Sequence, residues 1–273
     1  MRRVARGRRE GGLRLVTGWD TALRVEAVLL FDKSGLRAKS CTRPWFVRSR
    51  FRFLHVSVSA PSSGFFLSFE GSEGCGKSTQ IRLLHERLLQ VGQTVHVMRE
   101  PGSTNAGEAI RHLLQHASEG SGLTPEAELL LFAASRAQLV RERIRPLLRA
   151  GAFVILDRFL DSTSVYQGMA RGLPEEAVAA VNALAVGGTL PQLTVLLDLD
   201  TDTAWARIHA TGRELDRMES QPRAFYEKVR HGYLRLAQEN PDRIAIVDAS
   251  RPPEVVHEEI VKLVQARTHA LQA

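Results

Sequence analysis

The 273-residue chain lacks the long apolar runs that cross a bilayer, and it holds only two cysteines. No apolar stretch approaches the roughly 20 residues that a membrane-spanning helix needs, so we expect no membrane partner. Cys41 and Cys75 cannot build a disulfide framework, which favours a reducing, cytoplasmic compartment. Hydrophobic residues make up 44% and charged residues 25% of the chain. These fractions are those of a globular protein with a full core, and the length allows one large domain or two small ones.

The net charge of +7 is not evenly distributed along the chain. Residues 1–63 hold 14 arginines and lysines against 4 acidic residues, whereas the remaining residues hold 23 against 26. The basic character therefore belongs to the N-terminal segment. It does not indicate a nucleic-acid partner for the body of the protein.

Residues 1–63 show neither a helical nor a strand period, and a Pro/Ser/Gly hinge at residues 60–64 ends them. Three interpretations are open. The segment could be a disordered arm that contacts polyanions. It could be an organelle-targeting peptide, because it is rich in arginine and serine and poor in acids. It could also result from a start codon placed too far upstream. In each case we expect a basic, disordered and non-catalytic leader (residues 1–63) before a single domain at residues 64–273.

The most informative motif is the run GSEGCGKST, from Gly71 to Thr79, which matches G-x-x-x-x-G-K-[ST]. A short apolar run, Phe65–Phe69, precedes it, and a helical pattern over residues 81–91 follows it. A loop between a strand and a helix surrounds an anion with backbone N–H groups and the positive helix end. The sequence therefore predicts a phosphate loop that binds a nucleoside triphosphate. The loop residues are Gly71, Ser72, Glu73, Gly74, Cys75, Gly76, Lys77, Ser78 and Thr79.

Two side chains of this phosphate loop have specific expected roles. The Lys77 ammonium can reach the β- and γ-phosphates, and the Ser78 hydroxyl can ligate Mg²⁺. The glycines permit positive φ angles and a close approach of the backbone to the ligand.

Short apolar runs alternate with helical patterns through the body. We expect strands near residues 65–69, 94–98, 153–156, 193–199 and 244–247. We expect helices near residues 81–91, 105–116, 124–148, 174–186, 203–209, 222–238 and 253–270. This alternation predicts an α/β fold with a five-stranded parallel sheet covered by helices on both faces. Ligands then bind at the carboxyl ends of the strands, where polar residues such as Asp157 and Asp248 follow the apolar runs.

The phosphate loop alone does not separate GTPases, ATPases, helicases and small-molecule kinases. The guanine-reading motif N-K-x-D is absent from the sequence, and the body is short for a motor or a helicase. Arginines are frequent at the expected ligand edge, and guanidinium groups suit phosphoryl transfer between two phosphorylated molecules. These arginines are Arg99, Arg136, Arg158, Arg207, Arg213 and Arg217.

Six motifs, in this order, resemble those of thymidylate kinases. They are the phosphate loop, Arg99–Gly102, Leu131–Arg136, Asp157–Phe159, Ser162–Gly168 and Arg213–Glu219. The resemblance covers about residues 65–270 and none of the leader. It implies a P-loop NTPase fold, a three-layer α/β sandwich with a short lid. It also implies an enzyme that uses ATP and Mg²⁺ to convert dTMP to dTDP for dTTP synthesis, and a homodimer.

The resemblance assigns residues to the acceptor dTMP. Arg99 and Arg158 would hold its phosphate, and Phe132 would stack on thymine with Arg136 at the base edge. Tyr166 and Gln167 would line the deoxyribose and base side, with Tyr166 crowding a 2′-hydroxyl. The full expected set is Arg99, Phe132, Arg136, Arg158, Ser162, Thr163, Tyr166 and Gln167.

The resemblance also assigns catalytic roles. Lys77 and Arg158 would act on the phosphates, and Asp157 would support Mg²⁺ through water. Glu73 would bond either the acceptor sugar or a nearby arginine. Residues 211–221 would form a lid that excludes water. Because the phosphate loop holds no arginine, Arg213 of this lid is the expected catalytic cation, although Arg217 stays open as an alternative. Arg207 would lie near adenine.

Two rival functions stay open at this point. The first is another P-loop nucleotide or deoxynucleoside kinase that uses the same loop. The second is a nucleic-acid-binding ATPase that uses the basic leader, which would show DNA-stimulated ATP hydrolysis with a steep salt dependence. For the kinase, we expect no requirement for nucleic acid.

Overall fold

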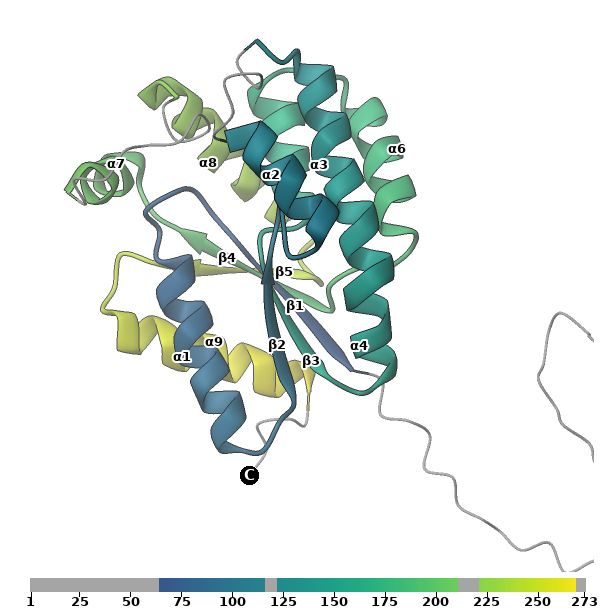
Figure 1. Ribbon diagram of the computed structural model, residues 1–273. Coiled ribbons are helices and arrows are strands. Elements are labelled where there is room, and N and C mark those ends of the chain that lie inside the picture. The colour runs from purple at the N-terminus through teal and green to yellow at the C-terminus, as the bar shows by residue number, and fades with distance from the viewer. Residues whose placement is uncertain (1–63, 116–121, 211–220, 269–273) are drawn as a thin grey trace, which may run out of the picture. The chain divides into compact units, whose positions relative to one another are not determined.

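A computed structural model describes residues 64–115, 122–210 and 221–268. Within them, five parallel strands form one sheet in the order β2–β3–β1–β4–β5 (Figure 1). The strands are β1 (Phe65–Glu70), β2 (Val95–Arg99), β3 (Phe153–Asp157), β4 (Leu193–Asp198) and β5 (Ile244–Asp248). The three central strands are buried almost throughout, which explains their continuous apolar sequences. The predicted five-stranded parallel α/β fold is confirmed.

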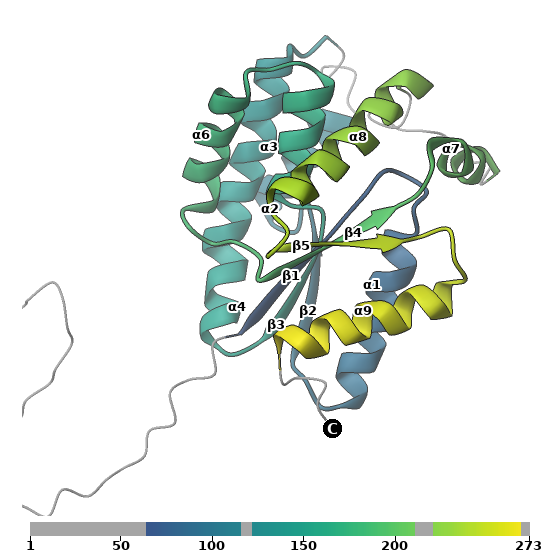
Figure 2. The same ribbon diagram turned by 180° about the vertical axis from the view of Figure 1, so that it is seen from behind.

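Helices cover both faces of the sheet, so that the described part has three layers (Figures 1 and 2). On one face, α1 (Lys77–Gln90) and α9 (Pro253–Arg267) pack against each other. The helices of the other face are α2 (Asn105–Gln115), α3 (Pro125–Leu139), α4 (Arg145–Arg149), α6 (Glu175–Val186) and α8 (Arg223–Glu239). Helix α7 (Thr201–Ala210) follows β4. None of the helices in the described ranges has both the length and the apolar content of a membrane span.

The alternation of side chains along β1 divides the core into two sides. Leu67 and Phe69 pack with Leu84 of α1 and Ile260 of α9, and all four are buried. Phe66, between them in sequence, points to the other side and belongs to a cluster with residues of α3 and β3. Burial of apolar side chains on both sides fixes the register of β1, because a shift by one residue would exchange the two sets.

The sequence predicted one long helix over residues 124–148, and the structure differs there. Helix α3 passes into a π-helical segment, η2 (Val140–Ile144), before α4 begins. Pro146 lies in α4 and has no backbone N–H, so it cannot donate a regular intrahelical hydrogen bond. The widened turns directly before it accommodate this defect without ending the helix.

A second difference is a helical segment that the sequence pattern did not predict. Residues 160–170 form α5 (Leu160–Thr163) and the π-helical η3 (Ser164–Ala170) directly after β3. The β-branched Thr163 and Val165 and the flexible Gly168 lower the intrinsic helix propensity of this stretch. Tertiary burial overrides that propensity, since Val165 and Tyr166 are buried against α8.

Candidate active site

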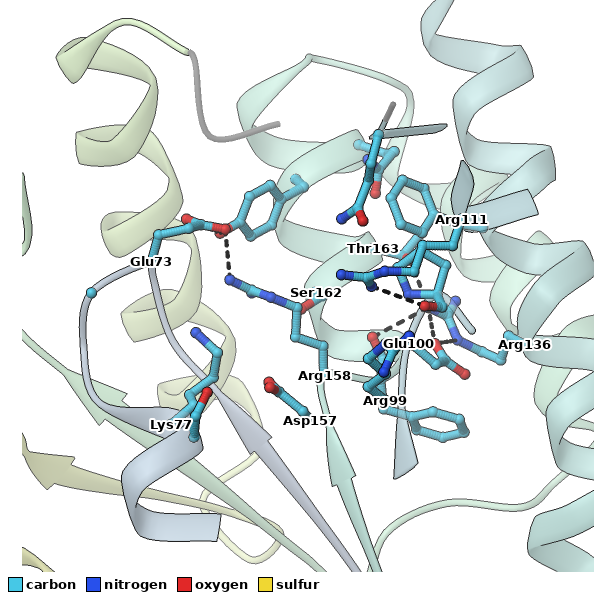
Figure 3. A pocket seen from close by; sticks show the side chains of 18 of the residues that line it. Glu73, Lys77, Arg99, Glu100, Arg111, Arg136, Asp157, Arg158, Ser162 and Thr163 are labelled. Atoms are coloured by element: carbon cyan, nitrogen blue, oxygen red, sulfur yellow. Dashed lines mark hydrogen bonds and ion pairs between the residues drawn. The ribbon is translucent and has the colours of Figure 1, made fainter. Parts of the chain in front are cut away.

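A cavity of about 600 Å³ lies at the carboxyl ends of β1, β2 and β3 (Figure 3). Arg99 and Asp157 are the last residues of β2 and β3 and pair in register, so the two strands present their polar ends together. Sixteen of the residues predicted from the sequence line this cavity: Glu73, Gly74, Gly76, Lys77, Ser78, Thr79, Arg99, Phe132, Arg136, Asp157, Arg158, Ser162, Thr163, Tyr166, Gln167 and Arg207. A volume of this size is typical of sites for small ligands.

Some predicted residues lie elsewhere. Gly71, Ser72 and Cys75 do not line the cavity, and Cys75 is buried in the core beneath the phosphate loop. Arg213, Arg217 and nearly all of the expected lid (residues 211–220) lie outside the described residues, as does the leader.

The start of α1 is built to receive an anion. Gly76 precedes the helix with φ 96°, a left-handed conformation that glycine adopts without strain. No side chain caps the helix, and its first turn contains no acidic residue. The first N–H groups of a helix have no partner within it, and they carry the positive end of its dipole. At this end of the cavity, these N–H groups are therefore suited to bind phosphate oxygens.

Lys77 lies in the first turn of α1 and folds back onto the phosphate loop. Its Nζ donates hydrogen bonds to the carbonyl oxygens of Gly71, at 3.1 Å, and Ser72, at 2.8 Å. The third N–H of the ammonium group donates to Cys75 Sγ at 3.7 Å, and because sulfur is a weak acceptor, a phosphate oxygen can replace that contact. The side chain lines the cavity although the residue is only 9% exposed.

Arg158 is fixed in place by contacts from four side chains. Its Nη2 donates to Glu73 Oε1 at 2.7 Å, and its Nη1 donates to Ser162 Oγ at 3.2 Å and Tyr233 OH at 3.1 Å. The guanidinium also lies 5.1 Å from the centre of the Tyr166 ring. Burial opposes the charge, but Tyr166 and Glu73 outweigh it and raise the pKa of Arg158 well above its ordinary value. A permanently charged, preoriented guanidinium therefore faces the cavity.

Glu73, the acidic residue of the phosphate loop, contacts an arginine. Besides Arg158, it accepts hydrogen bonds from Tyr166 OH at 2.8 and 3.0 Å. The sequence left two partners open for Glu73, the acceptor sugar or a nearby arginine. In this structure the partner is an arginine, Arg158. The ion pair with Arg158 offsets the negative charge that Glu73 brings to the phosphate loop.

Glu70, the last residue of β1, was missed by the sequence reasoning. It is fully buried and accepts hydrogen bonds from Phe159 N at 2.7 Å, Ser162 Oγ at 2.6 Å and Tyr233 OH at 2.8 Å. The Ser162 and Tyr233 hydroxyls each have one hydrogen. Because each donates it to Glu70, the lone pairs of both hydroxyl oxygens are left to accept from Arg158. The available signal was a carboxylate at the end of an otherwise apolar strand, immediately before the phosphate loop.

The titration of Glu70 gives a testable pH dependence. Burial, reinforced by Asp161, raises the pKa of Glu70 from 4.5 to about 7, against the opposing effects of Arg158 and two hydroxyls. Because the raised pKa favours the protonated folded form, this stabilisation is complete below pH 4.5 and is lost as the pH rises through about 7. We expect the free energy of unfolding of wild type minus that of Glu70→Gln to fall by roughly 2–3 kcal/mol across this interval.

Urea denaturation at several pH values measures this difference, with the exposed Glu176→Gln as the control. Parallel pH profiles for wild type and Glu70→Gln would contradict the expectation.

Arg136 is the largest fully buried side chain in the described ranges. Its Nε donates to Glu100 at 2.8 Å, its Nη1 to Asn182 at 2.7 Å, and its Nη2 to Thr163 at 2.9 Å. It also donates to the carbonyl oxygen of Phe159 at 3.2 Å. Four of the five guanidinium N–H groups are thus used, and one on Nη1 is left for a ligand. The predicted role at a base edge depends on that group.

Two further arginines lie at the β2 end of the cavity (Figure 3). The side chain of Arg99 is 52% exposed and pairs with Glu108 at 2.9 Å. A hydrogen bond from the Ser103 backbone, together with Arg99, lowers the pKa of Glu108. Arg111 of α2, which the sequence reasoning missed, donates to the Pro101 carbonyl oxygen at 3.0 Å. No sequence motif marks Arg111, because only the packing of α2 brings it to the cavity.

Asp157 and Ser78 fit the expected magnesium site. The Oδ1 atom of Asp157 is buried and has no hydrogen-bond partner, an arrangement that a metal-bound water would satisfy. Ser78 lines the same cavity. The described residues contain no cluster of three or more His, Cys, Asp or Glu side chains suited to a metal. Magnesium bound to a nucleotide needs no such cage, since phosphates and waters supply most of its ligands.

Comparison with known proteins identifies the family. The family model described as thymidylate kinase matches residues 69–260. A thymidylate kinase of Caldanaerobacter subterraneus is 45% identical over 202 residues, which span 74% of this chain and 95% of the relative. One of a Geobacter species is 48% identical over 192 residues, spanning 68% and 85%. The crystal structure of thymidylate kinase from Ehrlichia chaffeensis is similar with a TM-score of 0.60 and 33% identity, covering 74% of this chain and 99% of that one. The chain belongs to the thymidylate kinase family.

Proposed function

We propose that this protein is an ATP-dependent dTMP kinase, which transfers the γ-phosphoryl group of ATP to dTMP and yields ADP and dTDP. The reaction supplies dTTP synthesis. The observation that carries this proposal is the convergence of the phosphate loop, Lys77 and Arg158 on one cavity. Two polyanions repel each other, and these groups provide the counter-charge that lets them meet.

The donor half of the cavity binds ATP. The backbone N–H groups of the phosphate loop and the Lys77 ammonium hold the β- and γ-phosphates. Arg207 of α7 lines the cavity on an exposed helix face and lies beside adenine in this proposal. Ser78 and, through water, Asp157 would hold Mg²⁺. When bound, Mg²⁺ would supply positive charge that offsets the negative charge of the phosphates during transfer.

The acceptor half binds dTMP. Arg158 holds its phosphate, assisted by Arg99 and by Arg111. Phe132 stacks on the base, with Arg136 and Gln167 at its edge. Tyr166 lies against the deoxyribose, and Ser162 and Thr163 complete the acceptor side.

The chemical step is an in-line displacement. An oxygen of the dTMP phosphate attacks the γ-phosphorus of ATP, and the bond from that phosphorus to the β,γ-bridging oxygen breaks. Lys77 and the loop N–H groups stabilise the charge that develops on the leaving ADP. Arg158 neutralises the attacking phosphate, and Glu73 keeps Arg158 oriented. Arg213 of the lid supplies charge to the transferring group, with Arg217 as the alternative.

Steady-state phosphorylation of a panel of acceptors tests the proposal. With ATP and Mg²⁺, we expect kcat/KM to be highest for dTMP among dTMP, dUMP, UMP, CMP, AMP and thymidine. A preference for thymidine over dTMP would contradict the assignment of arginines to an acceptor phosphate. It would favour the alternative, a deoxynucleoside kinase.

Deletion of residues 1–63 tests the proposal that the leader is not catalytic. The residues that line the cavity begin at Glu73, so we expect kcat/KM for dTMP to change less than about twofold. A nucleic-acid-binding ATPase would instead lose DNA-stimulated ATP hydrolysis with the basic leader. Rates for the full chain and the deletion, with and without DNA at several salt concentrations, distinguish the two.

We also propose a cytoplasmic homodimer. The support for a dimer is two exposed leucines on helices that pack together: Leu130 of α3 is 58% exposed and Leu184 of α6 is 78% exposed. A second copy would cover them. Light scattering after size exclusion should give twice the chain mass for wild type and less for Leu184→Glu. The cytoplasmic location rests on the low cysteine content of the sequence.

A further inference from the structure

A buried carboxylate lies behind the wall of the cavity and has no role in the mechanism proposed above. Glu128, in the first turn of α3, is 1% exposed, and Thr124 caps the helix that carries it. Its Oε1 accepts from Arg171 Nε at 2.8 Å, and its Oε2 accepts from Arg171 Nη2 at 3.2 Å. A two-pronged arginine contact and the positive end of α3 both favour the ionised carboxylate.

The same carboxylate bonds the side chain of Gln167. Gln167 Nε2 donates to Glu128 Oε1 at 2.8 Å. The two ends of a glutamine amide differ, since the NH₂ group only donates and the oxygen only accepts. An ionised carboxylate cannot donate, so it forces the NH₂ end of Gln167 toward α3.

The opposite end of this amide is free for a ligand. Within the described ranges, Gln167 Oε1 accepts no hydrogen bond. The atom is also not fully buried. Gln167 lines the cavity together with Phe132 and Tyr166. The cavity wall therefore presents a hydrogen-bond acceptor, Gln167 Oε1. Glu128 determines this, because it binds the NH₂ end of the same amide.

We propose that Glu128, held by Arg171, is a positioning residue that sets the base selectivity of the enzyme through the orientation of the Gln167 amide. The inference rests on the proposed function. At N3, thymine carries a hydrogen that can be donated to Gln167 Oε1. Cytosine has a lone pair at N3, which would face the oxygen lone pairs and leave both acceptors unsatisfied. A site that forms a hydrogen bond with a substrate group strongly rejects analogues that lack this group.

The pair dTMP and 5-methyl-dCMP tests the proposal, because both bases carry the 5-methyl group and differ at the edge formed by N3 and position 4. The readout is the ratio of kcat/KM for dTMP to that for 5-methyl-dCMP. In Glu128→Met the amide can turn over and present its NH₂ group, so we expect this ratio to fall about tenfold or more. The matched control is Glu126→Met, an exposed residue of the same helix, for which the ratio should stay at the wild-type value.

A double-mutant cycle separates positioning from a merely structural role. If Glu128 acts through Gln167, adding Glu128→Met to Gln167→Ala should leave the ratio unchanged relative to Gln167→Ala. A further fall in the double variant, or a Glu128→Met variant that loses kcat/KM equally for both acceptors, would overturn the inference.

Arg171→Met provides a second test if Glu128→Met does not fold. The Arg171 side chain is 20% exposed, so its replacement is tolerated more readily. Without the cation, the buried Glu128 takes up a proton and can donate, and the amide of Gln167 loses its fixed orientation. The selectivity ratio should again fall about tenfold, and an unchanged ratio would overturn the inference. Absence of dTMP turnover in the wild type would instead refute the proposed function itself.

Discussion

Replacement of Lys77 by methionine is expected to lower kcat for dTMP phosphorylation by about 10²- to 10³-fold. Lys77 is the only basic residue of the phosphate loop, and negative charge develops on the β- and γ-phosphate oxygens during transfer. The substitution removes the hydrogen bonds to the carbonyl oxygens of Gly71 and Ser72, each worth about 1.5–3 kcal/mol with a charged donor, so we expect a less stable but folded variant.

The control for Lys77→Met is Lys262→Met, which removes an exposed lysine of α9. Steady-state kinetics and thermal unfolding of both variants give the comparison. A folded Lys77→Met enzyme that retains more than about a tenth of the wild-type kcat would contradict the assigned role.

Replacement of Arg158 by methionine is expected to lower kcat/KM for dTMP by about 10³-fold or more. Arg158 is proposed to neutralise the acceptor phosphate, and contacts from Glu73, Ser162, Tyr166 and Tyr233 orient it before dTMP arrives. Its backbone has φ 68°, a conformation in which arginine and methionine are similarly strained. The substitution therefore tests the guanidinium and not the backbone.

The effect of Arg158→Met should be specific to the acceptor. We expect a large rise in KM for dTMP and a change of less than about threefold in KM for ATP. The exposed Arg235→Met is the matched control. An unchanged KM for dTMP in a folded Arg158→Met enzyme would show that the acceptor phosphate binds elsewhere.

The main elements of the fold could be predicted because local sequence and burial agree there. The runs over Phe153–Asp157 and Leu193–Asp198 are mainly apolar, and both form central strands. The helical segment at residues 160–170 could not be predicted, since packing against α8 and not propensity stabilises it. The π-helical turns before Pro146 were not predicted either, because the proline indicates a defect in the helix but not the widened turns that accommodate it.

The same distinction applies to the site. Lys77, Asp157 and Arg158 belong to local motifs at strand ends, and the structure brings all three to one cavity. Glu70, Arg111 and Glu128 escaped notice because their importance arises from partners distant in sequence. Tyr233, for example, donates to Glu70 across 163 positions of the chain. Sequence motifs indicate the side chains that contact the ligand. They do not indicate the side chains that hold those residues in position.

The central claim is that ATP and dTMP meet in one cavity, between the phosphate loop and Arg158. A crystal structure with dTMP and a non-hydrolysable ATP analogue tests it most directly. We expect the analogue's γ-phosphate beside Lys77 and the dTMP phosphate within hydrogen-bond distance of Arg158, with the two phosphates in line. A dTMP phosphate bound away from Arg158, or a triphosphate outside the phosphate loop, would contradict the account.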